Sequence, residues 1–161
     1  MKKLIIGDIF AIQLNNGKFA YGQYIYYDNY RPMGISEYTG HGCMVRIFDL
    51  MADEIVDVSE VMDKKEMSPP VFTGLTGAIS KKRWKKIGHS LIKDFQYPKF
   101  RRTFGIKPGK YDDWKIWDGI EMKFIGELPQ EYRTLEILCV WGYENLEQRI
   151  ETGKSGHEGL I

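Results

Sequence analysis

The fold is decided by a hairpin near the amino terminus, made of DIFAIQL at residues 8–14, NNG at 15–17 and KFAYGQYIYY at 18–27. In the first segment Phe10, Ile12 and Leu14 alternate with other residues, which places their side chains on one face of a half-buried strand. Asn16-Gly17 is the strongest short hairpin signal, because both residue types tolerate a positive φ. Residues 8–27 therefore predict two antiparallel strands joined by a tight turn.

Further strands and one helix follow from the same kinds of pattern. A second hairpin, 114–117 with 120–125, is predicted around the turn dipeptide Asp118-Gly119, and Leu146 and Ile150, four residues apart, predict a short amphipathic helix over 144–150. The other predicted elements are strands at 43–50, 71–74, 84–88, 97–104 and 135–141, a strand or short helix at 54–62, and a long loop at 28–42. We expect one domain over 1–152 and a frayed tail over 153–161, which is rich in glycine and polar residues.

Charge is divided along the chain into blocks. The 161 residues carry 23 Lys+Arg and 22 Asp+Glu, for a net charge of +1. Residues 1–80 hold 7 basic and 10 acidic side chains, residues 81–110 hold 11 and one, and residues 111–161 hold 5 and 11. The block balances are thus −3, +10 and −6. The blocks either face charged partners or neutralise one another across the fold.

Composition excludes several classes of protein. No stretch of about 18 apolar residues is present, which excludes a membrane-spanning helix. The start, residues 1–6, imitates a secretion signal but ends at Gly7-Asp8, without the apolar region and cleavage site that a signal needs. Cys43 and Cys139 form neither a disulfide framework nor a metal-binding pair. We therefore expect a reduced, cytoplasmic protein with no membrane partner.

The sequence motifs contain no set of residues with the types and spacing that catalysis needs. His41, His89 and His157 are scattered, and a zinc site needs about four clustered ligands, whereas His41 and Cys43 supply two at most. Residues 105–110 resemble a phosphate-binding loop, but three residues separate the glycines and a proline removes a backbone N–H that the loop needs. We expect no enzyme activity, no metal and no cofactor.

The basic block offers a possible nucleic-acid surface. Clustered cations with interleaved aromatic residues are what a phosphate backbone and stacked bases select. The alternative is a solvated strand whose cations face the acidic block. The residues of this candidate patch are Lys82, Arg83, Trp84, Lys85, Arg101 and Arg102, within the segment 81–102.

An aromatic and acidic segment offers a second surface, which we favour as a partner-binding site. Tyrosine and tryptophan dominate binding hot spots, and acids supply charge complementarity. Packing of both tryptophans in the core is the alternative, and the sequence does not decide which tryptophans are exposed. The residues of this acid–aromatic patch are Tyr111, Asp112, Asp113, Trp114, Trp117 and Asp118.

Several of these stretches together resemble the immunity protein 26 family of bacterial polymorphic toxin systems. The resemblance begins at Gly7-Asp8-Ile9-Phe10-Ala11-Ile12 and continues through residues 17–23 and Ile47-Phe48-Asp49. Arg83-Trp84-Lys85-Lys86-Ile87-Gly88 is similar to the Trp-x-x-Ile-Gly signature of the family, and residues 141–150 are similar to its closing helix. The resemblance covers roughly residues 5–150.

The resemblance implies a fold and a function. It implies an α+β fold, which we expect as a mainly antiparallel, strongly twisted sheet or partly open barrel with a short C-terminal helix. It also implies a cytoplasmic immunity protein (antitoxin) that binds a cognate bacterial toxin domain and occludes the active site of that toxin in bacterial competition. A nucleic-acid-binding module using 81–102 is the alternative. A metal-dependent hydrolase is the third hypothesis.

Overall fold

The computed structural model describes residues 3–29, 41–93, 95–103 and 113–154, and it contains the predicted amino-terminal hairpin. Strand β1 (Asp8–Gln13) pairs antiparallel with β2 (Phe19–Asp28), with Ile12 opposite Ala20. Gly17 adopts a φ of +84°, the left-handed conformation that a tight hairpin turn requires. The local turn chemistry therefore predicted this element correctly.

The hairpin is the centre of a six-stranded sheet with the strand order β10-β4-β3-β2-β1-β5. All neighbours in it are antiparallel except β10 and β4, which run parallel. The other strands of this larger sheet are β3 (Gly42–Ala52), β4 (Val71–Thr73), β5 (Trp84–His89) and β10 (Val140–Trp141). The strands predicted at 43–50, 71–74 and 84–88 are confirmed. Part of the predicted loop at 28–42, residues 30–40, lies outside the described residues.

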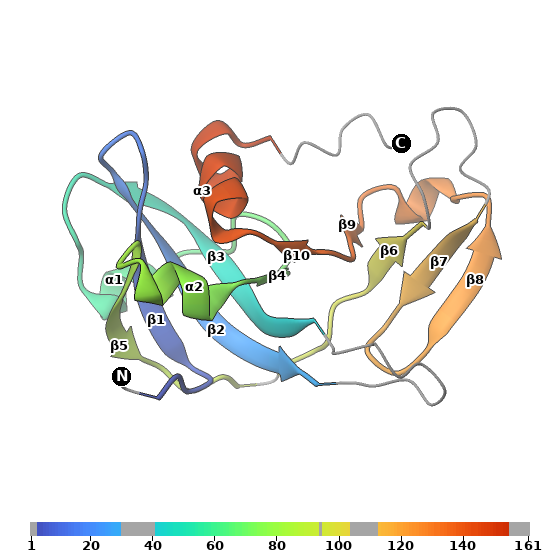
Figure 1. The fold of residues 1–161 in the computed structure, drawn as a ribbon, viewed down its shortest axis with the longest axis horizontal. Coiled ribbons are helices and arrows are strands. Elements are labelled where there is room, and N and C mark those ends of the chain that lie inside the picture. Colours follow the sequence, from blue (N-terminus) through green and yellow to red (C-terminus); the bar gives the residue numbers. More distant parts are fainter. Residues whose placement is uncertain (1–2, 30–40, 94, 104–112, 155–161) are drawn as a thin grey trace.

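A four-stranded sheet, in the order β8-β7-β6-β9, forms the other end of the molecule (Figure 1). The predicted second hairpin is confirmed, and the strand expected at 97–104 is shorter than predicted. The strands of this smaller sheet are β6 (Phe100–Arg102), β7 (Trp114–Trp117), β8 (Met122–Gly126) and β9 (Glu136–Ile137). Among the strands of the described residues, β8 pairs only with β7 and is an edge strand.

The apolar run 135–141 does not form the single strand that its hydrophobicity predicts. Glu136-Ile137 pairs with β6 in the smaller sheet, whereas Val140-Trp141 pairs with β4 in the larger one. Leu138, between the two short strands, is 5% exposed and its N–H donates to the carbonyl of Arg101 at 2.8 Å. The run therefore carries the chain from one sheet to the other through the core.

The helices are short. Of the strand or short helix predicted at 54–62, the structure contains the helix. A further helix, which the sequence did not predict, follows β4. The helices are α1 (Val58–Met62), α2 (Leu75–Ser80), α3 (Tyr143–Thr152) and the 3-10 turn η1 (Gln130–Tyr132). The predicted C-terminal helix is confirmed as α3, while residues 155–161 of the expected tail lie outside the described part of the chain.

The core lies in three clusters that follow from this layering. One face of the larger sheet packs against Leu75 of α2 and Leu146 of α3, and the opposite face packs against Val61 of α1. Between the two sheets, Phe72 of β4 packs with Trp117 of β7 in the third cluster. The fold is α+β, as expected. Within the described residues the strands form two mostly antiparallel sheets, and neither sheet closes into a barrel.

Asp8 fastens the start of β1 to β5. Its carboxylate is fully buried and lies 2.6 Å from Lys86 Nζ and 3.1 Å from His89 Nδ1, and it accepts the N–H of Ile5 at 3.1 Å. Burial alone raises the pKa of this carboxyl, but the hydrogen bonds from Lys86, Ile5 and His89 outweigh burial and lower the pKa of Asp8 below its ordinary value of 3.8. The buried carboxylate is therefore held in its charged form.

Candidate partner-binding surface

The two tryptophans of the acid–aromatic patch lie in the core. Trp114 is 1% exposed and the guanidinium of Arg101 lies 5.3 Å from the centre of its ring. Trp117 is 3% exposed and its indole N–H donates to the hydroxyl of Tyr97 at 2.9 Å. Both faces of β7 are thus covered, and neither indole offers contact area to a partner. Tyr111 and Asp112 lie outside the described residues.

The two described acids of the patch hold local structure. Asp113 accepts a hydrogen bond from the hydroxyl of Thr103. Asp118 Oδ1 accepts the backbone N–H groups of Glu121 at 3.0 Å and Ile120 at 2.9 Å, and these hydrogen bonds lower the pKa of Asp118. Asp118 therefore closes the β7–β8 turn while its carboxylate remains half-exposed.

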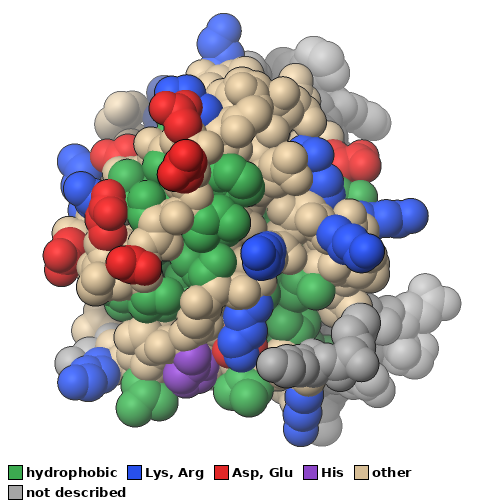
Figure 2. Space-filling view, turned by 90° about the vertical axis from the view of Figure 1, so that its left-hand side faces the viewer, with side chains coloured by type: hydrophobic (Ala, Val, Ile, Leu, Met, Phe, Trp, Pro, Cys, Tyr) green, Lys and Arg blue, Asp and Glu red, His purple; other side chains and the backbone are tan. Residues whose placement is uncertain are grey.

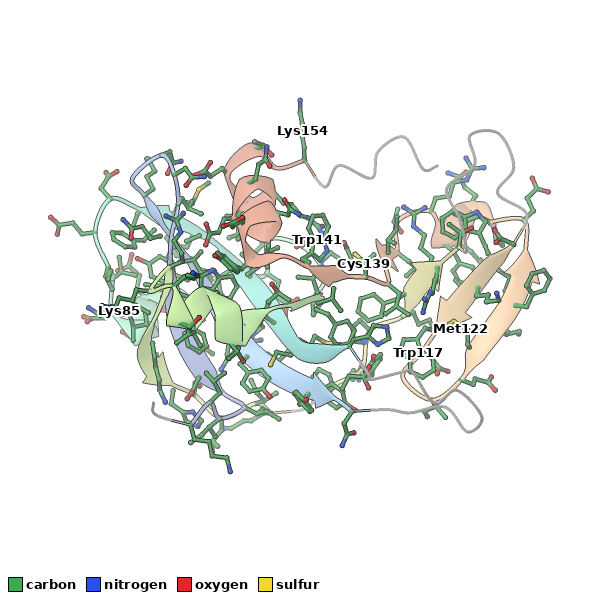
Figure 3. The ribbon with its side chains drawn as sticks, in the orientation of Figure 1. Lys85, Trp117, Met122, Cys139, Trp141 and Lys154 are labelled. Carbon is green, nitrogen blue, oxygen red and sulfur yellow. The ribbon has the colours of Figure 1, made fainter. Side chains whose placement is uncertain are left out.

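The exposed apolar side chains of this region belong to the β7–β8 turn and to the strand after it. Ile120 is 78% exposed, Phe124 is 62% exposed and Met122 is 37% exposed. Met122 lies opposite the buried Trp117 in the register of the two strands, and Figure 3 shows both at the same end of the molecule. We call Asp118, Ile120, Glu121, Met122, Lys123 and Phe124 the hairpin surface.

The hairpin surface combines features that proteins use to bind one another. An edge strand presents unpaired backbone groups, and a large exposed aromatic residue beside aliphatic ones is a common anchor for a partner. The sequence signal for these residues was the spacing of Ile120, Met122 and Phe124 after Asp118-Gly119. That alternation predicts a strand with one apolar face, but it does not tell whether the face is covered.

The structure does not bring the basic patch together. Lys82 and Lys85 are exposed at one edge of the larger sheet, whereas Arg101 and Arg102 belong to β6 of the smaller sheet. Figure 3 places Lys85 at the end of the molecule away from Met122.

Trp84 is also in the core, which removes the aromatic platform from the nucleic-acid alternative. It is 1% exposed and its indole N–H donates to Glu147 Oε1 at 3.1 Å. Arg83 is paired with the same carboxylate at 2.7 Å, and Arg101, 5% exposed, donates from Nε to the carbonyl of Leu135 at 2.9 Å. Burial lowers the pKa of the Arg101 guanidinium. Stacking of bases on Trp84 is not available in this arrangement.

A polar cleft of about 680 Å³ lies beside the ion pair of Arg83 and Glu147. The sequence did not predict this cleft. Its carboxylates have structural partners, because Glu147 binds Arg83 and Trp84, and Glu151 accepts the N–H of Asn16 at 2.9 Å. The lining residues come from the β1–β2 turn, the start of β5 and α3: Asn15, Arg83, Glu144, Asn145, Glu147, Gln148, Glu151 and Thr152.

Neither metal-binding clusters nor long apolar helices occur in the described part of the chain. There, no three or more His, Cys, Asp and Glu side chains gather where they could hold a metal ion. None of the described helices has the length and apolar character to span a bilayer.

The described residues form a small α+β fold with an exposed apolar strand at one edge. The chain belongs to the immunity protein 26 family, whose family model matches residues 5–112. No curated protein and no solved structure matches the chain. The matched residues include β1 to β6, so the β7–β8 hairpin and α3 lie beyond the part of the chain that the family model covers.

Proposed function

We propose that this protein neutralises a cognate bacterial toxin domain by binding it in the cytoplasm and occluding its active site, without catalysis of its own. Membership of an immunity protein family is the observation that carries the proposal. Occlusion requires only a stable complex, and stable complexes commonly bury about 1,600 Å² in total. A chain with 10019 Å² of accessible surface has room for such an interface.

We propose the hairpin surface, with its neighbour Asp113 and the adjoining Tyr111 and Asp112, as the contact with the toxin. Ile120 and Phe124 would anchor the interface, because the burial of large exposed apolar side chains supplies most of the binding energy at a hot spot. The described carboxylates here, those of Asp113, Asp118 and Glu121, would attract a basic toxin surface and raise the rate of association. A toxin that binds phosphate groups presents such a surface. Trp114 and Trp117 would not touch the toxin. Their buried side chains would hold β7 in place beneath the hairpin surface.

The first experiment tests the function. The adjacent upstream reading frame is sequenced, and if it encodes a large secreted protein, the carboxy-terminal domain of that protein is co-expressed with the chain in bacteria. Growth and complex formation are then measured. We expect restored growth and a stoichiometric complex. Growth arrest that the chain does not relieve, with no complex between the purified proteins, contradicts the proposal.

A second experiment tests the surface separately from the function. Ile120→Ser combined with Phe124→Ser removes the anchors, and we expect a loss of toxin affinity of about 100-fold, from about 2 to 3 kcal/mol of lost apolar burial. Leu91→Ser, at a residue that is 73% exposed outside the hairpin surface, is the matched control. Unchanged affinity of the double variant, with protection intact, rejects the surface and keeps the function.

A variant that tests the acidic charge of the hairpin surface must leave the β7–β8 turn intact. Asp118→Lys removes the acceptor for two backbone N–H groups, so a weaker complex would not separate charge from turn structure. Glu121→Lys reverses a carboxylate whose side chain holds no backbone group in the described structure. We expect slower association with the toxin, and the difference from the unmodified protein shrinks as salt is added.

A further inference from the structure

α1 lies at the end of the molecule opposite the hairpin surface (Figure 1). This end carries an apolar strip that α1 only partly covers. Ile55, between β3 and α1, is 39% exposed. Further hydrophobic side chains of the underlying cluster are half-buried: Phe19, Leu50, Ala52, Val56, Val58, Met62 and Ile87. We call this strip, together with the exposed acids of 53–63 and Lys85 beside it, the α1 face.

Opposite charges lie on the two sides of this strip. Figure 2 shows hydrophobic side chains in the middle of this end of the molecule, with acidic side chains gathered on one side and basic ones mostly on the other. The segment 53–63, which leads into and contains α1, has five acids and no base. Its exposed carboxylates are Asp53, Glu54, Asp57, Glu60 and Asp63.

Lys85 stands on the basic side of the same face. It pairs with Ala11 in the β1–β5 register, and Ala11 belongs to the apolar cluster beneath α1, so Lys85 projects from this face of the sheet. Gly88, whose Cβ position would lie 2.4 Å from Val58 Cγ2, marks where α1 touches β5. Three residues along a strand separate Lys85 from that contact by about 10 Å.

The charges on the α1 face are largely unneutralised by other described residues. Asp53 lies 3.7 Å from Lys18, and both side chains are exposed, so this pair contributes little. Within residues 3–29, 41–93, 95–103 and 113–154, neither Lys85 nor the carboxylates of Glu54, Asp57 and Asp63 form an ion pair. Such a pattern, an apolar strip between free charges of opposite sign, is complementary to itself.

We propose that the α1 face binds the α1 face of a second copy of this chain, which forms a two-fold symmetric dimer. A two-fold axis lying along the apolar strip sets the acidic side of each copy against Lys85 of the other, and sets apolar strip against apolar strip. Such an interface is isologous, so each charge contact occurs twice. A standard interface takes about 800 Å² from each chain, which is a small share of the 10019 Å² of accessible surface.

The dimer leaves the hairpin surface open. In Figure 1 α1 and β5 lie at one end of the long axis and β8 at the other, so the two hairpin surfaces would point outward from the two ends of the dimer. The proposal therefore stands independently of the toxin contact.

Sedimentation equilibrium of the purified protein over about 1 to 500 μM tests the proposal. We expect concentration-dependent dimers that weaken as salt rises from about 50 mM to about 500 mM, because exposed charges are screened. Lys85→Glu raises the dissociation constant about tenfold or more, since two attractive contacts become repulsive. Lys154→Glu makes the same charge change at an exposed residue after α3, and leaves the dimer unchanged.

A charge swap identifies the interface. Glu54→Lys with Asp63→Lys reverses the acidic side outside the first turn of α1, and this variant alone is also expected to be monomeric. Mixed with the Lys85→Glu variant, it forms heterodimers, because both charge contacts in the mixed pair are again attractive. A monomer at every concentration and salt, or a dimer that neither variant weakens, overturns the proposal. Two monomeric variants that stay monomeric when mixed also overturn it.

Discussion

Arg83 Nη2 lies 2.7 Å from Glu147 Oε2, and this contact joins the basic block of the sequence to the acidic one. Arg149, within the acidic block itself, donates to both carboxylate oxygens of Glu136, at 2.5 and 2.9 Å. Part of the charge segregation is therefore neutralised inside the fold. The charges of the α1 face and of the hairpin surface remain at the surface, at opposite ends of the molecule.

Glu147→Ala is expected to destabilise the protein by about 3 kcal/mol, because it leaves the guanidinium of Arg83 and the indole N–H of Trp84 without their shared acceptor. Urea unfolding followed by tryptophan fluorescence measures the change. Glu144→Ala, on the exposed side of the same helix, is the control and is expected to cost less than about 0.5 kcal/mol. Equal losses in the two variants would show that the buried ion pair contributes nothing particular.

Asp8 is expected to make stability depend on pH in the acid range. The pKa of Asp8 is lowered in the folded protein from its ordinary value of 3.8, so the unfolded chain binds its proton at higher pH than the folded chain does. Its contribution is therefore fully present above about pH 4 to 5, and is lost as the pH falls through 3.8 and below. Unfolding free energies of the protein and of Asp8→Asn, measured from neutral pH downward, are expected to converge at low pH. A constant difference would contradict this assignment.

Local signals predicted much of the fold. Asn16-Gly17 and Asp118-Gly119 specify turns by their own backbone preferences, so both hairpins could be predicted without knowledge of the rest of the chain. Leu75 and Ala78 of α2 carry no comparable signal, because the helix depends on packing against the larger sheet. The run 135–141 is apolar throughout, and hydrophobicity alone does not tell which sheet each half joins.

Prediction of the candidate site from sequence was limited in the same way, because local sequence does not show long-range packing. Trp114 and Trp117 point to opposite sides of β7 and both are buried, because the larger sheet covers one side and Arg101 the other. The sequence of a strand does not show whether one or both of its faces are covered, because that depends on long-range contacts. Phe124, on the neighbouring strand, has the same aromatic character and is left exposed because β8 is at the edge. Charge and aromatic content therefore drew attention to this hairpin but did not predict which of its residues are exposed.

Gly7→Ala is expected to destabilise the protein by about 3 kcal/mol, for two separate reasons. Gly7 has a φ of +105°, and a Cβ there would lie 2.6 Å from both the carbonyl oxygen of Ser90 and Cε1 of His89. Gly17→Ala is the matched control, since Gly17 has a φ of +84° but a Cβ there meets nothing within 4 Å. The control isolates the backbone cost, about 1 kcal/mol. Equal losses, measured by thermal unfolding, would show that the close approach to β5 is relieved without cost.

Phe124→Ser and Trp117→Ala are expected to differ sharply in stability although the residues lie on neighbouring strands. Phe124 is 62% exposed, so its replacement removes little buried area and costs less than about 1 kcal/mol. Trp117 packs with Phe72 and Phe100 between the sheets and donates to Tyr97, so its truncation leaves a cavity and costs about 4 kcal/mol. Urea unfolding of both variants measures the contrast. A large loss for Phe124→Ser would mean that its ring supports the fold, and it would remove this residue as an anchor for the toxin.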